Sequence, residues 1–276
     1  MHRAGIGDAL HLSDVASLMA AGEGEQFHPP GPADFEFAPL FGEGTFFTKP
    51  MLIIVLATLA IAAFFYLASR RASLVPDKVQ FAGESVYGFV RNGIVGDSIG
   101  RAGRPFVAYL TTLFCFIAML NLAGIIPVLQ LPATSKIAIP LFLAIISWAI
   151  FNYVGIKRHG FLGYFKNMMF PPGLPKPIYL LLAPLEFFST VIIRPVTLTL
   201  RLTLNMFAGH LVLLLTVLGG EYLLVEKGGA LALASVVPFA FSIILTFFEA
   251  FVQLLQAYVF VLLSALYIAG ALADEH

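Results

Sequence analysis

The sequence predicts an all-α integral membrane protein with five membrane segments and one interfacial amphipathic helix. Of its 276 residues, 59% are hydrophobic and 12% are charged, and the mean hydropathy is +0.90. A soluble domain is on average about half apolar and about a quarter charged. Several apolar runs reach the ~20 residues that a membrane helix needs, and most charged residues lie between these runs.

The five candidate membrane segments differ in length. They are residues 51–68, 105–127, 137–156, 178–219 and 229–272. At ~1.5 Å per residue, each of the last two would measure about 60 Å, twice the ~30 Å hydrocarbon thickness. Each fits two upright spans joined by a tight turn, or one strongly tilted helix. Because no Gly–Pro turn interrupts either run, and proline can kink a helix without ending it, we expect two long, tilted, antiparallel helices.

The polar parts of the chain predict its organisation. Residues 1–48 carry seven acids and no sustained periodicity, so we expect an acidic N-terminal tail before a membrane domain at 49–276. This tail lacks a basic stretch followed by an apolar core, which argues against a cleavable signal peptide. Residues 77–97 alternate apolar and polar at helical spacing, which indicates the interfacial amphipathic helix.

The distribution of Lys and Arg predicts the topology. Loops 69–104 and 157–176 together hold ten of these residues, whereas the opposite side holds four. By the positive-inside rule, the N-terminus and the acidic tail are extracytoplasmic and the C-terminus is cytoplasmic.

Arg201 is the most informative residue. It lies in an apolar run long enough to cross a bilayer, and no acid occurs between Glu186 and Glu221. A charge at the membrane centre costs several kcal/mol, roughly 3–10 depending on the reference state, and arginine does not lose its proton. Thr197 and Asn205, four residues to either side, share its helix face. Arg201 is therefore expected to face a partner that carries an anion, or a wet cavity.

A second set of polar residues lies nearby. His210 follows Arg201 by nine residues, about 13 Å along the axis and half a turn around it, so it faces elsewhere. Glu249, Gln253 and Gln256 are spaced i, i+4 and i+7 on one face of the last segment, a pattern typical of a helix that lines a wet path or a polar interface. Antiparallel packing predicts that His210 and Glu249 lie at similar depth.

Structural interpretations stay open for several of these residues. Arg194 fits a snorkelling interfacial arginine, and Glu186 fits a position at the headgroup level. Gln253 fits a hydrogen-bonding contact between helices. Taken together, carboxylates and a His that can exchange protons, beside an arginine that cannot, indicate proton transport.

The run RPVTLTLRLTLNMFAGH, residues 194–210, resembles the signature of the a subunit of rotary F-type ATP synthases, bacterial type. Arg201 matches the family's essential arginine, Asn205 its asparagine and His210 the polar position after Ala-Gly. Some bacterial members carry Glu at the His210 position and His at the Glu249 position. These identities are exchanged here, which predicts that the two side chains meet.

The resemblance covers about residues 50–272, and the first 48 residues match nothing in the family. Gln256 matches the glutamine of the last helix, and Glu186 matches an acid of the inner channel. The run that begins at Asn121 is similar to the Asn-Leu-x-x-Leu-x-Pro motif of the second span. Gly124 occupies a position where many members carry Asp, so one acid of the outer channel is missing.

The resemblance implies a stator subunit that offers two offset aqueous half-channels to a ring of c-type hairpin subunits. Protons would enter near His210, Glu249 and Asn121, protonate a ring carboxylate, and leave near Glu186, while Arg201 prevents a leak. A b-type peripheral stalk subunit, the whole F-type complex and the bilayer of a bacterial cell (inner) membrane are the implied partners and location. ATP would form on a separate soluble head, without covalent chemistry, metal or cofactor on this chain.

Two other functions, a secondary transporter or channel and an intramembrane enzyme, agree less well with the sequence. An ion-coupled secondary transporter or channel usually shows internal repeats with helices broken at matching positions, and no such symmetry is visible. An intramembrane enzyme would need a catalytic motif, and the sequence contains no HExxH motif and no Asp pair. The single cysteine, Cys115, provides no disulfide framework. The formal net charge is zero, and no nucleic-acid partner is expected.

Overall fold

The computed structural model describes residues 49–70, 73–126, 133–169, 176–227 and 234–273. All regular structure in these ranges is helical, which confirms the all-α prediction. The expected N-terminal tail, the end of the second span at Pro127, most of the Pro-rich turn and Gly229 lie outside the described residues.

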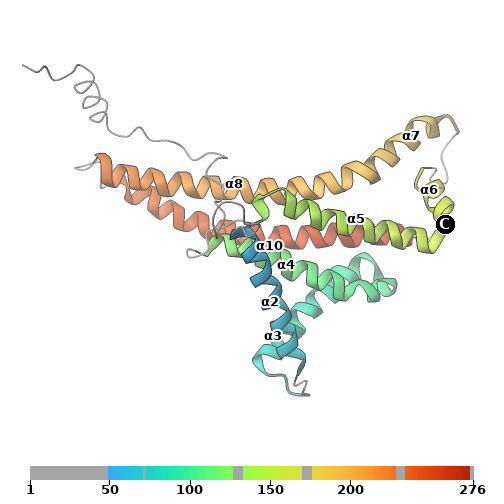
Figure 1. The fold of residues 1–276 in the computed structure, drawn as a ribbon, viewed down its shortest axis with the longest axis horizontal. Coiled ribbons are helices and arrows are strands. Elements are labelled where there is room, and N and C mark those ends of the chain that lie inside the picture. Colours follow the sequence, from blue (N-terminus) through green and yellow to red (C-terminus); the bar gives the residue numbers. More distant parts are fainter. Residues whose placement is uncertain (1–48, 71–72, 127–132, 170–175, 228–233, 274–276) are drawn as a thin grey trace, which may run out of the picture. The chain divides into compact units, whose positions relative to one another are not determined.

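The helices follow one another without strands between them in the described ranges (Figure 1). They are α2 (Lys49–Arg70), α3 (Lys78–Gly88), η2 (Phe89–Gly96), η3 (Gly100–Phe106), α4 (Val107–Ile125), η4 (Ala133–Ser135), α5 (Ala138–His159), α6 (Phe161–Met169), α7 (Lys176–Phe188), η5 (Ser189–Ile193), α8 (Arg194–Tyr222), η6 (Leu223–Lys227) and α10 (Val236–Leu272). The segments η2, η5 and η6 are π-helical, and η3 and η4 are 3₁₀-helical.

Five of these helical stretches are long and apolar enough to cross a membrane, as predicted. They are Pro50–Arg70, Gly100–Ile125, Ala138–His159, Leu181–Val225 and Val236–Leu272. The fourth has 45 residues and the fifth has 37. Neither contains the tight turn that two upright spans would need, so each is one long helical stretch.

The chain forms two compact units. Among the described residues, unit 1 is made of those within Leu211–Leu245, and unit 2 of those within Glu36–His210 and Thr246–His276. Within unit 1, α8 and α10 pack closely, and a Cβ added to Gly220 would lie 3.1 Å from the Phe239 ring. All site residues discussed below belong to unit 2.

The core of unit 2 lies between α4, α5 and the C-terminal part of α10, which run side by side in Figure 1. Leu110 and Ile117 of α4, Ala144 of α5 and Phe260 of α10 are completely buried in it. One face of α8 and the π-helical η2 complete this core. The core therefore fixes the positions of the helices that carry the polar residues.

A polar contact ties the same three helices together inside the core. The Tyr109 hydroxyl of α4 and the Ser147 hydroxyl of α5 lie 2.8 Å apart, and Ser264 of α10 donates to Ser147 over 3.3 Å. Buried hydroxyls that are all hydrogen-bonded favour one helix arrangement over others.

Two parts of the fold differ from the sequence-based expectation. The helix expected over 77–97 is present as α3 and η2, but Val90 and Ile94 of η2 are fully buried in the core. The segment expected as a loop over 157–176 contains α6. Gly160, with φ +74°, ends α5, and α6 then packs back on it. Space for this contact comes from a glycine, since a Cβ on Gly155 would lie 2.2 Å from the Tyr164 ring.

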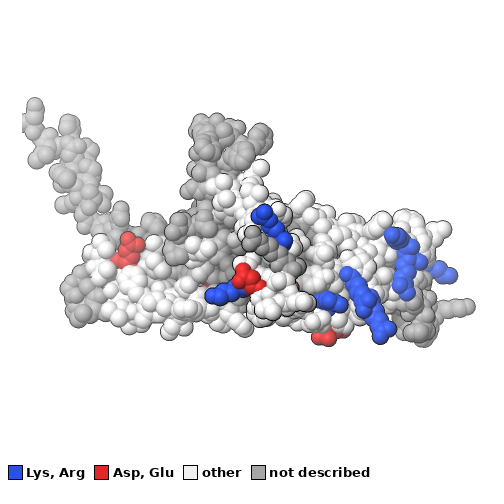
Figure 2. Space-filling view, turned by 90° about the horizontal axis from the view of Figure 1, so that it is seen from below, with Lys and Arg blue, Asp and Glu red and all other residues white. Residues whose placement is uncertain are grey.

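In Figure 2, the basic side chains lie from the middle of the visible face to one end, with a few acidic side chains among them. The exposed Lys and Arg of η2, η3, α5 and α6 are Arg91, Arg101, Arg104, Lys157, Arg158 and Lys166. Apolar side chains are extensively exposed over α2, α8 and α10, as expected for helices that face lipid or other membrane chains.

Candidate functional site

Arg201 lies on an exposed face of α8. Thr197, one turn before it, is also exposed, and Asn205, one turn after it, is half-buried, so the three residues form the predicted stripe. The opposite face is buried through Leu198 and Leu202. Within the described part of the chain, the guanidinium of Arg201 has no hydrogen-bond or ion-pair partner. An anion for Arg201 must therefore come from outside these residues.

The first half of α8 and the last part of α10 run antiparallel. The guanidinium carbon of Arg194, at the start of α8, lies 5.1 Å from the ring centroid of Tyr267, near the end of α10. Sixteen residues later on α8 and eighteen earlier on α10, His210 contacts Glu249. The two contacts place Arg201 between two polar clusters, about 10 Å from one and about 13 Å from the other along the helix.

The first cluster joins His210 to the polar stripe of α10. His210 Nδ1 and Glu249 Oε1 are 3.0 Å apart, and Gln253 Nε2 donates to the same carboxylate oxygen over 2.9 Å. All three side chains are buried, with 8%, 6% and 1% of each residue exposed. The predicted contact between His210 and Glu249 is confirmed. The side chain of Gln253 thus bonds to Glu249 of its own helix, α10.

Gly209 provides the space that this contact needs. A Cβ at this position would lie 3.0 Å from Glu249 Oε1, 3.1 Å from Cδ and 3.3 Å from Cγ. These distances are shorter than ordinary van der Waals contact, so any side chain at this position would move the carboxylate. The sequence motif that contains Gly209 does not by itself indicate this close approach to Glu249.

Asn121 anchors the α10 stripe to α4. Its side-chain amide donates to the backbone carbonyl of Gln253 over 3.2 Å. Its Oδ1 accepts from the hydroxyl of Thr134 in η4 over 2.8 Å. Asn121 and Thr134 are 1% and 0% exposed, so each side chain depends on the other for this hydrogen bond. Thr134 was not predicted, because a lone threonine after a Pro-rich loop carries no pattern that marks it.

Three buried polar atoms of the α10 stripe lack a partner among the described residues. They are Glu249 Oε2, Gln253 Oε1 and Gln256 Nε2. Such atoms are rare in protein interiors, because each costs about 1–3 kcal/mol when it is left unpaired. A row of them along one helix face is typical of a path that binds water or protons.

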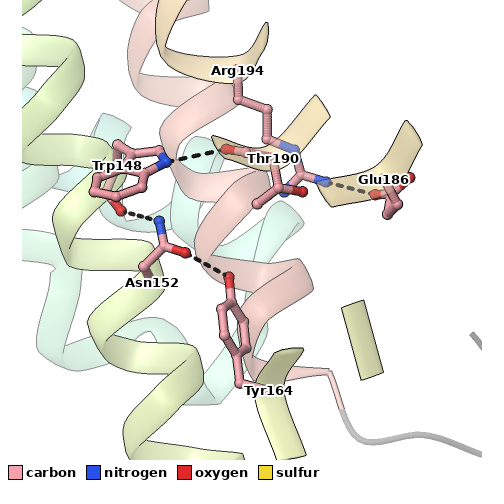
Figure 3. A network of polar contacts seen from close by, with 6 residues as sticks. All are labelled: Trp148, Asn152, Tyr164, Glu186, Thr190 and Arg194. Atoms are coloured by element: carbon pink, nitrogen blue, oxygen red, sulfur yellow. Dashed lines mark hydrogen bonds and ion pairs between the residues drawn. The ribbon is translucent and has the colours of Figure 1, made fainter. Parts of the chain in front are cut away.

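The second cluster, shown in Figure 3, lies at the other end of the α8 stripe. Arg194 Nη2 and Glu186 Oε1 form an ion pair at 3.3 Å. The guanidinium also lies over the Tyr267 ring at 5.1 Å and over the Phe151 ring at 6.0 Å. These contacts fix Arg194 in place, unlike a snorkelling arginine that extends freely to the headgroups.

A π-helical turn shapes this cluster. The backbone N–H of Arg194 donates to the carbonyl of Ser189, five residues back, and not to that of Thr190. Trp148 Nε1 of α5 donates to the Thr190 carbonyl instead, over 3.1 Å (Figure 3). Pro195 follows directly, and a proline clashes with the carbonyl four residues before it, which favours a widened turn.

The network continues from Trp148 to α6. Asn152 Nδ2 donates to the Trp148 carbonyl over 2.8 Å, and the Tyr164 hydroxyl donates to Asn152 Oδ1 over 3.1 Å (Figure 3). Burial raises the pKa of Tyr164, and the charge of Arg194 partly opposes this rise. Tyr164 is therefore a neutral donor. Trp148, Asn152 and Tyr164 were not predicted from the sequence, because only the unexpected helix α6 completes their network.

The carboxylate and imidazole groups of the site can hold and exchange protons. No group of three or more His, Cys, Asp or Glu that could bind a metal occurs in the ranges that the structure describes. A carboxylate lies on each side of a permanently charged arginine, Glu249 beside the His210 imidazole on one side and Glu186 on the other. The arginine faces outwards, whereas Glu249 and His210 are turned inwards.

Comparison of the sequence with known proteins identifies the family to which this chain is similar. The family model described as ATP synthase A chain matches residues 51–269. A protein of Nocardioides sp. called ATP synthase subunit a is 46% identical over 276 residues, covering 96% of this chain and 100% of that protein. Proteins of the same name from Streptomyces lividans and Rhodococcus erythropolis are each 43% identical, covering 92% and 91% of this chain and 91% and 93% of their own lengths.

Proposed function

Because the chain belongs to the family of ATP synthase subunit a, the proton-translocating subunit in the membrane sector of an F-type ATP synthase, we propose that Arg201 separates two half-channels that exchange protons with a rotating ring of c-type hairpin subunits. The guanidinium of Arg201, exposed and without a partner among the residues that the structure describes, carries this proposal. A membrane carboxylate of a ring subunit would supply the missing anion. The alternative of a secondary transporter or channel is not favoured by the family.

The outer half-channel is proposed to run along the α10 stripe. His210 Nδ1 and Glu249 Oε1 lie 3.0 Å apart, close enough for a proton to pass between them. Gln253 and Asn121 hold the carboxylate and its helix in place. Gln256 would extend this path towards Arg201.

The inner half-channel is proposed to start at Glu186. Its carboxylate is partly exposed and lies beside Arg194, so it can receive a proton from a ring carboxylate and release it to the aqueous side. The hydroxyl of Thr197 already bonds to the carbonyls of Ile193 and Arg194, and it would line this path without relaying protons.

Arg201 is proposed to drive the exchange between these paths. A guanidinium attracts an ionised carboxylate and keeps its own proton, so a ring carboxylate that reaches Arg201 must release its proton first. Asn205, on the same stripe, would hydrogen-bond to the arriving group. The membrane potential contributes about 2.3 kcal/mol per charge for each 100 mV. ATP is made elsewhere in the complex.

The assembly and its orientation are part of the proposal. We place the chain in a bacterial cell (inner) membrane, with the acidic N-terminal tail, residues 1–48, outside and the C-terminus in the cytoplasm, because basic residues dominate one side. A b-type peripheral stalk subunit would hold this chain static while the ring turns.

Cysteine crosslinking in the whole complex tests which chain faces Arg201. Leu200 and Leu204 flank Arg201 and are 40% and 56% exposed, so Leu200→Cys and Leu204→Cys should crosslink to cysteines placed near the ring carboxylate. Thr199→Cys is the matched control, since Thr199 is 2% exposed. Equal crosslinking of all three, or capture of a chain other than a ring subunit, would contradict the proposal.

A further inference from the structure

Unit 2 contains a second site that the proton path does not use, a cavity between α2 and α4. Its volume is about 420 Å³, within the ~300–1,000 Å³ of typical ligand pockets. The lining residues come from α2, α3 and α4; they are Thr58, Ile61, Ala62, Phe65, Tyr87, Ala108, Thr111, Thr112 and Phe116. Ala62 and Ala108 are exposed, so the cavity opens sideways, towards the surface that α2 presents to the membrane.

The wall offers little polarity to a ligand. The three lining threonine hydroxyls all donate to backbone carbonyls of their own helices, Thr58 over 2.7 Å, Thr111 over 2.8 Å and Thr112 over 2.9 Å. A polar ligand would lose its hydration without replacement hydrogen bonds. The cavity therefore suits a flexible apolar chain.

Basic residues flank the lining segments of α2 and α4 at one end of the cavity. Ile53 and Ala57 of α2 pack near Leu120 and Ala123 of α4, so the two helices run antiparallel. The end of α2 and the start of α4 therefore share one end of the cavity, and the exposed Arg70 and Arg104 follow and precede the lining residues there. Arg70 lies five residues after Phe65 and Arg104 four residues before Ala108.

The hydroxyl of Tyr87 adds a polar group to the wall. Tyr87 is 40% exposed, and its hydroxyl has no hydrogen-bond partner in the described ranges. Gly83, one turn earlier, lets α3 approach α2, since a Cβ there would lie 2.9 Å from Ala68 Cβ. Tyrosines, with an apolar ring and a polar hydroxyl, are enriched at the membrane interface.

From this combination, we propose that the cavity between α2 and α4 is a binding site for one acyl chain of an anionic phospholipid, whose phosphate lies against Arg104 and Arg70. Arginine binds phosphate oxygens through two parallel hydrogen bonds. The bound lipid would fill the space between α2 and α4. It would cover part of α2, which is otherwise little buried, with 11% of its span inside the chain. The site acts on packing and does not take part in proton exchange.

Photolabelling of the whole ATP synthase complex tests the site. The complex is reconstituted in phosphatidylcholine vesicles with a small fraction of phosphatidylglycerol that carries a diazirine on one acyl chain. After illumination, mass spectrometry should find label on the lining residues of α2 and α4. Ala62→Phe should reduce this label about tenfold, the loss expected when about two buried methylenes are displaced.

Matched variants decide the outcome. Ala60→Phe makes the same change on an exposed residue of α2 that does not line the cavity, and it should leave the label unchanged. Ala108→Phe fills the cavity from α4, and it replaces Ala62→Phe in the test if the complex with Ala62→Phe does not assemble. Arg104→Gln should remove the preference for phosphatidylglycerol over a matching phosphatidylcholine probe.

Two results would overturn the proposal. One is equal label in the Ala60→Phe and Ala62→Phe complexes, which would mean ordinary lipid contact with no site. The other is an unlabelled cavity together with loss of another membrane subunit from the Ala62→Phe complex, which would mean that a protein helix fills the space.

Discussion

Glu249 and His210 meet at 3.0 Å through one carboxylate oxygen, Oε1, which also accepts a hydrogen bond from Gln253. The other oxygen, Oε2, is buried without a partner among the described residues. The neighbours of Glu249 described here thus fix its carboxylate through one oxygen only.

Exchanging the two residues should preserve part of the function. We expect His210→Ala and Glu249→Ala each to slow proton uptake by vesicles on the order of a hundredfold, the scale of a lost proton-transfer group. The double variant His210→Glu with Glu249→His keeps one acid and one imidazole in contact, and it should recover part of this loss. Additive losses in the single variants with no recovery in the exchange would mean that the residues act independently.

Gly209→Ala should disturb the carboxylate without removing it. The new Cβ would lie 3.0 Å from Glu249 Oε1, so the side chain must shift by a few tenths of an ångström. Because small misplacements at reacting groups have large effects, proton transport should fall by roughly tenfold. Gly219→Ala on the same helix, where a Cβ meets nothing within 4 Å, is the control and should transport normally.

Thr134→Val should weaken the anchor between α4 and α10. The change keeps the shape but leaves Asn121 Oδ1 without its 2.8 Å donor, and an unpaired buried acceptor costs about 1–3 kcal/mol. The complex should unfold at lower temperature. Thr216→Val is the control, since this hydroxyl bonds only to the carbonyl of Leu213 in its own helix. Equal melting temperatures for the wild-type and Thr134→Val complexes would contradict the anchoring role.

Glu186→Gln should slow proton release more than it affects stability. The ion pair with Arg194 is partly exposed, and such pairs contribute about 0–1 kcal/mol. The substitution removes the only acid in the second cluster as the structure describes it, so ATP-driven proton pumping should fall several-fold while assembly is retained. Glu221→Gln, on the same long helix, should not change pumping. A normal rate for Glu186→Gln would remove Glu186 from the proposed inner path.

The features that depend on periodicity and charge were predictable from the sequence. Two uninterrupted apolar runs predicted the two long helices, and antiparallel packing predicted the contact between His210 and Glu249. Both predictions are confirmed. The proposed closeness of Gln256 to Arg201 stays a prediction, and we expect their side chains to lie within about 10 Å, beyond which no single water can bridge them.

The parts that the sequence did not predict depend on backbone geometry. The π-helical turn before Pro195 frees the Thr190 carbonyl for Trp148, and hydrophobic spacing does not distinguish a π turn from an α turn. Likewise, α6 depends on the tight contact between Gly155 and Tyr164, which is invisible until the chain has folded back. Close approach at glycines and widened turns are tertiary features.

ATP synthesis driven by a proton gradient in vesicles that contain the complex with Arg201→Ala is the most direct test of the proposed mechanism. We expect synthesis to be abolished while the complex stays assembled, because a ring carboxylate would no longer be forced to release its proton. Arg201→Lys should also fail largely, since an ammonium lacks the planar fork and can lose its proton when buried. Arg101→Ala, at an exposed arginine outside both clusters, should synthesise normally. Normal synthesis by the Arg201→Ala complex would contradict the mechanism.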